Sequence, residues 1–116
     1  MNENNIGDPE LINQLNDLMA KLPKGIHLMS QYGAALADAD SEYRKAKAIR
    51  TARLKDEGTP VTLIKDLIYE DDDLDYLLRK RDQAEALWKT SQENINVLKL
   101  QIKVLQSQIE REWANS

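Results

Sequence analysis

The 116-residue sequence has no cysteine, no phenylalanine and one histidine, and it contains only four glycines and three prolines. The lack of cysteine excludes disulfides, thiolate catalysis, and zinc or iron–sulfur sites held by cysteine. So few glycines and prolines cannot supply the frequent turns of a β-sandwich or β-barrel. No apolar run approaches the roughly 20 residues that cross a bilayer, and the acidic, Asn-rich start is not that of a signal peptide. These absences predict a helical, cytoplasmic protein that contacts no membrane.

Catalytic and metal-binding patterns are also missing. His27 and Ser30 lie one helical turn apart, but no third group orients them, so His27 is interpreted as a surface or capping residue. The scattered glycines form no phosphate-binding loop. The acidic run 70–75 starts with the spacing of an EF-hand, but Tyr76 stands where that loop needs glycine, and the twelfth position is Asp82. We therefore expect no enzymatic activity, no cofactor and no bound metal.

Two helices are predicted in the first half of the chain. Residues 1–8 are polar and are expected to be flexible. Pro9 suits the first helical position, and apolar residues at spacings of three and four predict a short N-terminal helix over 9–22. The Pro-Lys-Gly segment 23–25 is predicted to end it. A second, longer helix is predicted over 26–56.

The apolar stripe of this second helix begins at Met29 and runs to Ala46, and the same steps then reach Arg50 and Arg53. The stripe thus becomes basic in its last two turns. Gly58 is expected to adopt the left-handed conformation that ends many helices.

A connector helix is predicted over 61–70, where apolar residues line one face, although its β-branched residues leave a strand as an alternative. The acidic residues that follow are suited to cap a helix and to interact with the positive end of its dipole. A last helix is therefore predicted over 74–113.

This last helix carries a seven-residue repeat that is typical of a coiled coil. Leu, Trp and Ile recur at the first core position, with Arg81 as the polar interruption, and a second series follows three residues after the first. A further apolar strip, formed by Val97, Leu100 and Val104, lies off this seam. One partner helix would not cover both, so the region 95–109 is expected to be buried on two sides.

Together these patterns predict one all-α domain over 9–116. Its expected architecture is an extended antiparallel helical hairpin with a long C-terminal coiled-coil helix, plus short N-terminal and connector helices. A rod of two helices buries little surface per residue, so we expect a homo-oligomer, a partner protein, or both. The residues predicted to form that interface are Trp88, Ile95, Val97, Leu98, Leu100, Ile102, Val104, Leu105, Ile109 and Trp113.

A basic segment contains six Lys and Arg residues and no acidic residue: Arg44, Lys45, Lys47, Arg50, Arg53 and Lys55. It could bind the phosphates of nucleic acid, contact an acidic partner, or pair within the chain with the acidic residues 70–75, for example Arg50 with Asp73. Because Arg50 and Arg53 lie on the stripe expected to face the last helix, internal pairing is favoured over nucleic acid. The net charge of −4 argues neither for nucleic acid nor for a membrane surface.

The segment from Ala46 to Thr62 and the coiled coil from Ile95 to Trp113 resemble the small, acidic, helical accessory proteins that bacteriophages and prophages encode. The resemblance implies a protein in the bacterial cytoplasm that binds host or phage machinery, including inhibitors of host defence or of DNA-processing enzymes. It transfers no functional residue. We therefore expect a non-enzymatic protein–protein interaction module, an adaptor or inhibitor that acts through helical surfaces. The alternatives are a nucleic-acid-binding accessory protein that uses residues 44–55, and a structural or assembly coiled-coil protein.

Overall fold

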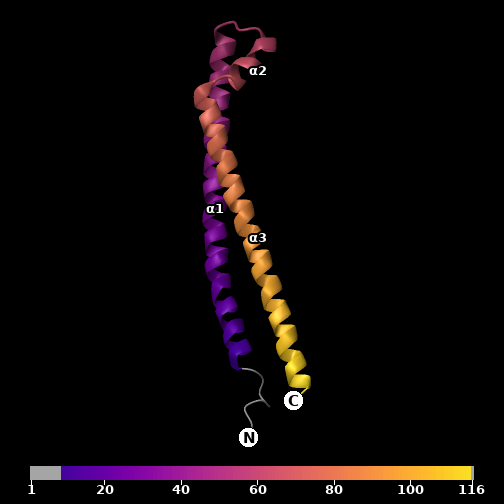
Figure 1. Ribbon diagram of the computed structural model, residues 1–116. Helices are drawn as coiled ribbons and strands as arrows, with labels where there is room; N and C mark the ends of the chain where they lie inside the picture. The colour runs from indigo at the N-terminus through magenta and orange to yellow at the C-terminus, as the bar shows by residue number, and fades with distance from the viewer. Residues whose placement is uncertain (1–8, 116) are drawn as a thin grey trace. The chain divides into compact units, whose positions relative to one another are not determined.

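The computed structural model describes residues 9–115, which form three α-helices (Figure 1). These are α1, Pro9–Asp56, α2, Val61–Tyr69, and α3, Asp72–Ala114. No strand occurs between residues 9 and 115. The predicted all-α helical hairpin with a long C-terminal helix is therefore confirmed. The predicted flexible segment 1–8 lies outside the described residues.

The chain divides into two compact units. The first unit combines the chain up to Ser30 with the chain from Thr90 onward, and the second unit is Gln31–Lys89. Each unit contains a part of α1 and a part of α3 running in opposite directions, and the second unit also contains α2.

The predicted end of the first helix at 23–25 is wrong, because α1 continues through Pro23 and Gly25 as one helix of 48 residues. The spacing of the apolar stripe explains this continuity. Leu22, Gly25 and Met29 follow one another in steps of three and four, so the stripe stays in phase across the proline. Pro23 lies off the stripe and is exposed. Packing of an amphipathic face supplies most of a helix's stability in a protein, and here it outweighs the local tendency of Pro and Gly to end the helix.

In the first unit, α1 and α3 pack through the predicted seam of α3. Ile95 is buried against Gly25: a Cβ atom placed on Gly25 would lie 3.5 Å from Ile95 Cγ1. Further along α3, Leu105 is also buried. The opposing stripe of α1 is half-buried, and it consists of Leu11, Leu15, Leu18 and Leu22. The seven-residue repeat of α3 thus forms the contact between the two helices of this unit.

In the second unit, the interior of the hairpin includes Trp88, Leu54 and Leu74. A Cβ atom on Gly33 would lie 3.3 Å from Trp88 Nε1, so glycine leaves room for the indole ring. Leu54 is buried and Arg53 is exposed, so the expectation that Arg53 faces α3 is wrong. A straight α-helix drifts by about 20° per seven residues from a strict heptad repeat, and this drift brings the next residue, Leu54, to the interior.

The end of α1 is formed by Gly58 in the predicted left-handed conformation, with φ of 79°. The Gly58 N–H donates to the Lys55 carbonyl and the Thr59 N–H donates to the Leu54 carbonyl, both at 3.0 Å. This is the Schellman pattern, which satisfies carbonyl groups at the end of the helix. After Pro60 the chain forms α2, so the connector is a helix and the strand alternative is wrong.

α3 begins at Asp72, two residues before the predicted start, because Asp71 caps it. Asp71 Oδ1 accepts a hydrogen bond from the Leu74 N–H at 2.9 Å, and Asp71 Oδ2 lies 3.2 Å from Arg50 Nε of α1. The Arg50 Nε–H does not point at this oxygen with the geometry of a hydrogen bond, so the contact is an electrostatic one. The end of α1 and the start of α3 are thus joined by an ion pair as expected, with Asp71 in place of Asp73.

Asp71→Ala is expected to destabilise the protein by about 1–2 kcal/mol, because it removes both the helix cap and the partner of Arg50. Asp71→Asn keeps a capping oxygen and loses only the charge, so it should cost no more than about 1 kcal/mol. Urea unfolding followed by circular dichroism measures both. Asp73→Ala is the matched control and should change the stability by no more than about 0.5 kcal/mol. Equal losses for the alanine variants at positions 71 and 73 would contradict the double role of Asp71.

Candidate interaction surfaces

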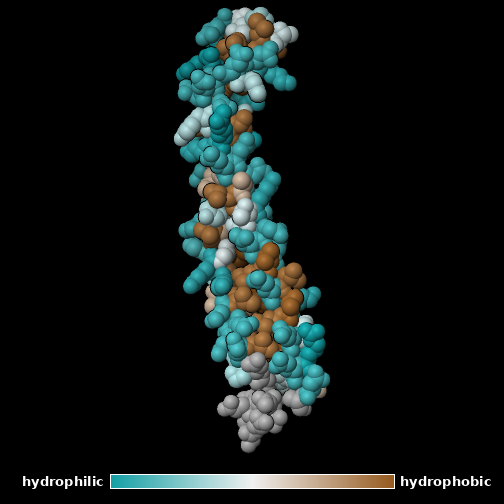
Figure 2. All heavy atoms as spheres, viewed as in Figure 1, coloured by the Kyte–Doolittle hydropathy of each residue, from teal (hydrophilic) through white to brown (hydrophobic). Residues whose placement is uncertain are grey.

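The outward side of α3 in the first unit carries an exposed apolar strip. Val97, Leu100 and Val104 are 44%, 61% and 57% exposed. They follow one another at three and four residues, so they share one face of the helix and lie off the seam. We call these three residues the outer strip. Figure 2 shows apolar side chains gathered among polar ones over the first unit, where α1 begins and α3 ends.

Most of the predicted interface residues are occupied within the chain. The hairpin buries or half-buries Trp88, Ile95, Leu98, Ile102, Leu105 and Ile109. Four predicted residues remain exposed: the outer strip, and Trp113, which is 55% exposed. The seam therefore makes the hairpin itself, and the outer strip and Trp113 are the part of the predicted interface that another molecule can reach.

Three further apolar residues of the first unit are exposed and are absent from the predicted interface residues. Met19, Ile26 and Leu28 of α1 are 49%, 46% and 44% exposed. Met19 and Ile26 directly follow stripe positions in the sequence, so they lie at the edge of the helix contact. One sequence signal could have identified them: the stripe already supplies one residue for each turn of α1, so further apolar residues beside it are not needed for the contact with α3.

The basic segment is only partly neutralised within the chain. Arg44 Nε lies 2.8 Å from Asp40 Oδ2 on the same helix, and Arg50 pairs with Asp71 as described above. The Lys47 ammonium lies 5.9 Å from the centroid of the Tyr43 ring. Within residues 9–115, no carboxylate lies within 4.0 Å of the remaining members, which are Lys45, Lys47, Arg53 and Lys55. Internal pairing therefore accounts for two of the six basic side chains.

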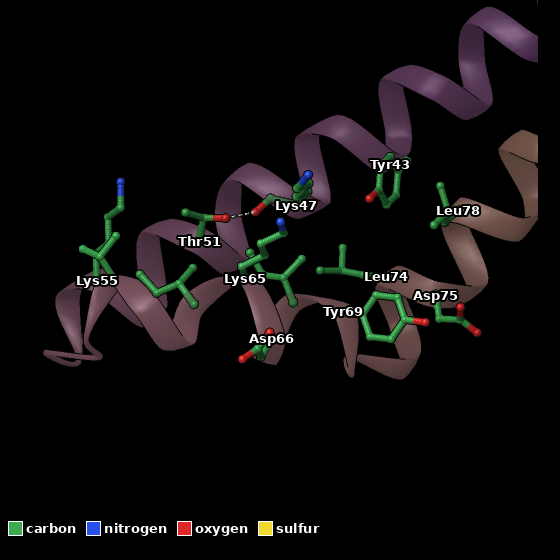
Figure 3. A pocket seen from close by; sticks show the side chains of 13 residues that line it. Tyr43, Lys47, Thr51, Lys55, Lys65, Asp66, Tyr69, Leu74, Asp75 and Leu78 are labelled. Carbon is green, nitrogen blue, oxygen red and sulfur yellow. Dashed lines mark hydrogen bonds between the residues drawn. The ribbon is translucent and has the colours of Figure 1, made fainter.

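A groove lies between the end of α1, the inner side of α2 and the start of α3, entirely within the second unit (Figure 3). Its volume is about 580 Å³. The apolar lining comes from Val61, Ile64, Ile68, Leu74 and Leu78. We call this feature the groove. A volume of this size falls within the range of sites that bind ligands or side chains of a partner.

Charged and aromatic residues are unevenly distributed along the groove. Lys47, Lys55 and Lys65 line it, as do Tyr43 and Tyr69. Figure 3 shows the two tyrosines toward one end and Lys55 at the other, with Lys47 and Lys65 between them. All three lysines are exposed. Lysines therefore occupy one end and the middle of the groove, whereas the other, aromatic end holds the two tyrosines and Asp75.

A second depression adjoins the groove on α1, beside the same turns of the helix. It has a volume of about 430 Å³ and shares Lys47, Thr51 and Lys55 with the groove. Its other lining residues are Arg44, Ala48 and Ala52. Small side chains between basic ones give a shallow surface on which another chain could pack closely.

Sequence reasoning found the basic residues of this region but not the groove. The groove combines residues from three helices, and the packing angle of α2 decides whether its apolar face is covered. The available signal was the one-sided apolar pattern of 61–70, which predicted an apolar face on the connector helix without showing what covers it.

No protein-family model matches the chain, and no curated protein or solved structure is significantly similar to it. Among the described residues, no group of three or more His, Cys, Asp or Glu side chains is placed to hold a metal ion. No described helix is long and apolar enough to cross a membrane. The surfaces of the two units are thus the basis for a functional proposal.

Proposed function

We propose that this protein is a non-enzymatic protein–protein interaction module that acts by occupying a surface of its partner. The outer strip of α3 carries the proposal. Its three side chains are about half exposed or more, although the seam of the same helix is covered by α1. Contiguous exposed apolar side chains rimmed by polar residues mark protein interaction sites more often than inert surface.

The surroundings of the outer strip suit an interface. Lys99, Gln101, Lys103 and Gln106 are exposed beside it on α3. A polar rim around an apolar centre is the usual arrangement of a protein interface, because the centre excludes water while the rim remains solvated. The regular spacing on one helix also suits a partner helix, whose side chains could pack between those of α3.

The partner can be a second copy of this chain, another protein, or both in turn. A homo-oligomer would cover the outer strip by pairing equivalent surfaces. The resemblance to phage and prophage accessory proteins supports a partner in host or phage machinery, with this protein as an adaptor or an inhibitor in the cytoplasm. A structural or assembly role would use the same surface.

The triple variant Val97→Ser, Leu100→Ser, Val104→Ser tests this function. Because all three residues are exposed, the variant should keep its helical circular dichroism spectrum. Its self-association in light scattering at micromolar concentration, or its capture of a partner from the native cell, should weaken about tenfold or more, since burial of a Val or Leu side chain contributes about 1.5–3 kcal/mol. A wild type that is monomeric and captures nothing would contradict the proposal.

The second candidate function is nucleic-acid binding, which the unpaired lysines and Arg53 of the basic segment favour. Lys45→Ala, Lys47→Ala, Arg53→Ala is the matched triple variant. It should leave unchanged both self-association and the capture of a partner that binds the outer strip. If this variant alone loses capture, and if the wild type is retained on DNA in low salt and released as salt rises, nucleic acid is the partner instead.

A further inference from the structure

The groove of the second unit is a separate site from the outer strip, with no residue in common. We propose that it holds an acidic amphipathic helix of a partner protein, whose apolar face lies on the groove floor and whose carboxylates face Lys47, Lys55 and Lys65. This site does not depend on the function proposed for the first unit. Three observations support it: the charge of the groove, its length, and its apolar floor.

The charge of the groove calls for an anionic occupant. None of the three lysines has a carboxylate within 4.0 Å in the described part of the chain. Two carboxylates, those of Asp66 and Asp75, also line the groove. Asp75 pairs with Arg79 at 3.0 Å, and Figure 3 shows both carboxylates turned away from the lysines. The lysines therefore remain available to carboxylates of another molecule, and complementary charges of this kind select the partner and speed its association.

The length of the surface favours a helix over a small anion. The groove follows α1 from Tyr43 to Lys55, about 18 Å at the rise of an α-helix, and the second depression lies beside it over the same turns. A helix of about three turns matches this length. Ala48 and Ala52, which line the adjoining depression, leave space beside the groove for the side chains of such a helix.

The floor of the groove provides the apolar half of the recognition. Leu74 and Ile64 are buried and form its base, whereas Tyr69 is 85% exposed at the aromatic end. An exposed tyrosine beside an apolar floor is suited to close over an incoming side chain, since aromatic residues are enriched at interface centres. Recognition of an amphipathic helix in such a groove uses apolar anchors at positions i, i+3 or i+4, and i+7.

The experiment uses the full chain and a displayed library of random peptides about 16 residues long, which is sufficient for a helix of roughly 24 Å. Panning on the wild type should enrich peptides with apolar residues at helical spacing and flanking Asp or Glu. The charge-reversal variant Lys47→Glu, Lys55→Glu, Lys65→Glu should bind these peptides about tenfold or more weakly and should enrich basic peptides instead. Tyr69→Ala should weaken the wild-type peptides without changing their charge preference.

The matched control is Lys21→Glu, Lys24→Glu, Lys45→Glu, which reverses three exposed lysines that line neither depression. It should bind the enriched peptides as the wild type does, and all variants should keep the wild-type circular dichroism spectrum. The proposal is overturned if the wild type enriches neutral or basic peptides, or if the charge-reversal variant binds the same peptides equally well. It is also overturned if no peptide is enriched while a labelled oligonucleotide binds the wild type and not that variant.

Discussion

Ile95→Asp is expected to unfold the first unit at room temperature or to lower its stability by about 4 kcal/mol or more. Ile95 is 5% exposed and lies against Gly25 of α1. Burial of an isoleucine side chain contributes about 1.5–3 kcal/mol. A carboxylate in its place would be buried without a partner, which adds a penalty of several kcal/mol. Together these effects approach the whole stability of a small domain. Thermal unfolding by circular dichroism, and hydrogen exchange of the amides in 9–30 and 90–115, measure the loss.

Leu100→Asp is the matched control for this prediction. It makes the same kind of change five residues further along α3, at a side chain that is 61% exposed. Its effect on stability should stay within about 0.5 kcal/mol, because the new carboxylate remains in water. It should instead weaken self-association or partner binding, since it places a charge in the outer strip. Equal destabilisation by the two variants would contradict the assignment of Ile95 to the seam and Leu100 to the outer surface.

These two residues also show how far the sequence alone determines the site. The seven-residue repeat distinguishes Ile95 from Leu100, and the structure places the first inside the hairpin and the second outside it. The repeat could not show which of the predicted interface residues would be used by the chain itself. That depends on the register in which α1 lies along α3, and this register is visible only in contacts such as Gly25 with Ile95 and Gly33 with Trp88.

The sequence predicted correctly that the basic and acidic segments are in contact, but the predicted partner of Arg50 was wrong. Arg50 pairs with Asp71 because that residue lies just before α3, where its carboxylate both caps the helix and reaches α1. Position 73 is already inside the helix, and its side chain is exposed. Because a helix start can shift by one or two residues in any prediction from sequence, the partner of Arg50 could not be assigned without the cap.

The predicted helix end at 23–25 was wrong because two features of the sequence conflict there. Local propensity favoured a break, since a proline inside a helix removes a hydrogen bond and its ring collides with the carbonyl of residue i−4. The phase of the stripe favoured continuity, since Leu22, Gly25 and Met29 keep one face toward α3. In the structure, α1 continues without a break and keeps the stripe on one face, so Pro23 lies within a helix that it destabilises.

Pro23→Ala is therefore expected to stabilise the protein by about 2 kcal/mol. Proline is about 3 kcal/mol less favourable than alanine inside a helix. Part of this gain is offset, because the unfolded chain has more conformational entropy with alanine than with proline. This effect lowers the stability by roughly 0.4–1 kcal/mol. Pro23 is exposed, so the replacement removes no buried contact. Urea unfolding followed by circular dichroism measures the change, and hydrogen exchange of the amides near position 23 locates it.

Pro9→Ala is the control for this gain, because Pro9 is the first residue of α1, where no intrahelical hydrogen bond is lost. Only the effect on the unfolded chain applies there, so the variant should lower the stability by no more than about 1 kcal/mol. The two variants differ only in the place of the proline within one helix, so their difference measures the cost of Pro23 itself. A gain at position 9 as large as at position 23 would contradict the assignment of the gain to the interior position of Pro23 in the helix. A loss of stability in Pro23→Ala would contradict a continuous α1. Proline at the end of a helix carries no penalty, so its replacement there would only increase the entropy of the unfolded chain.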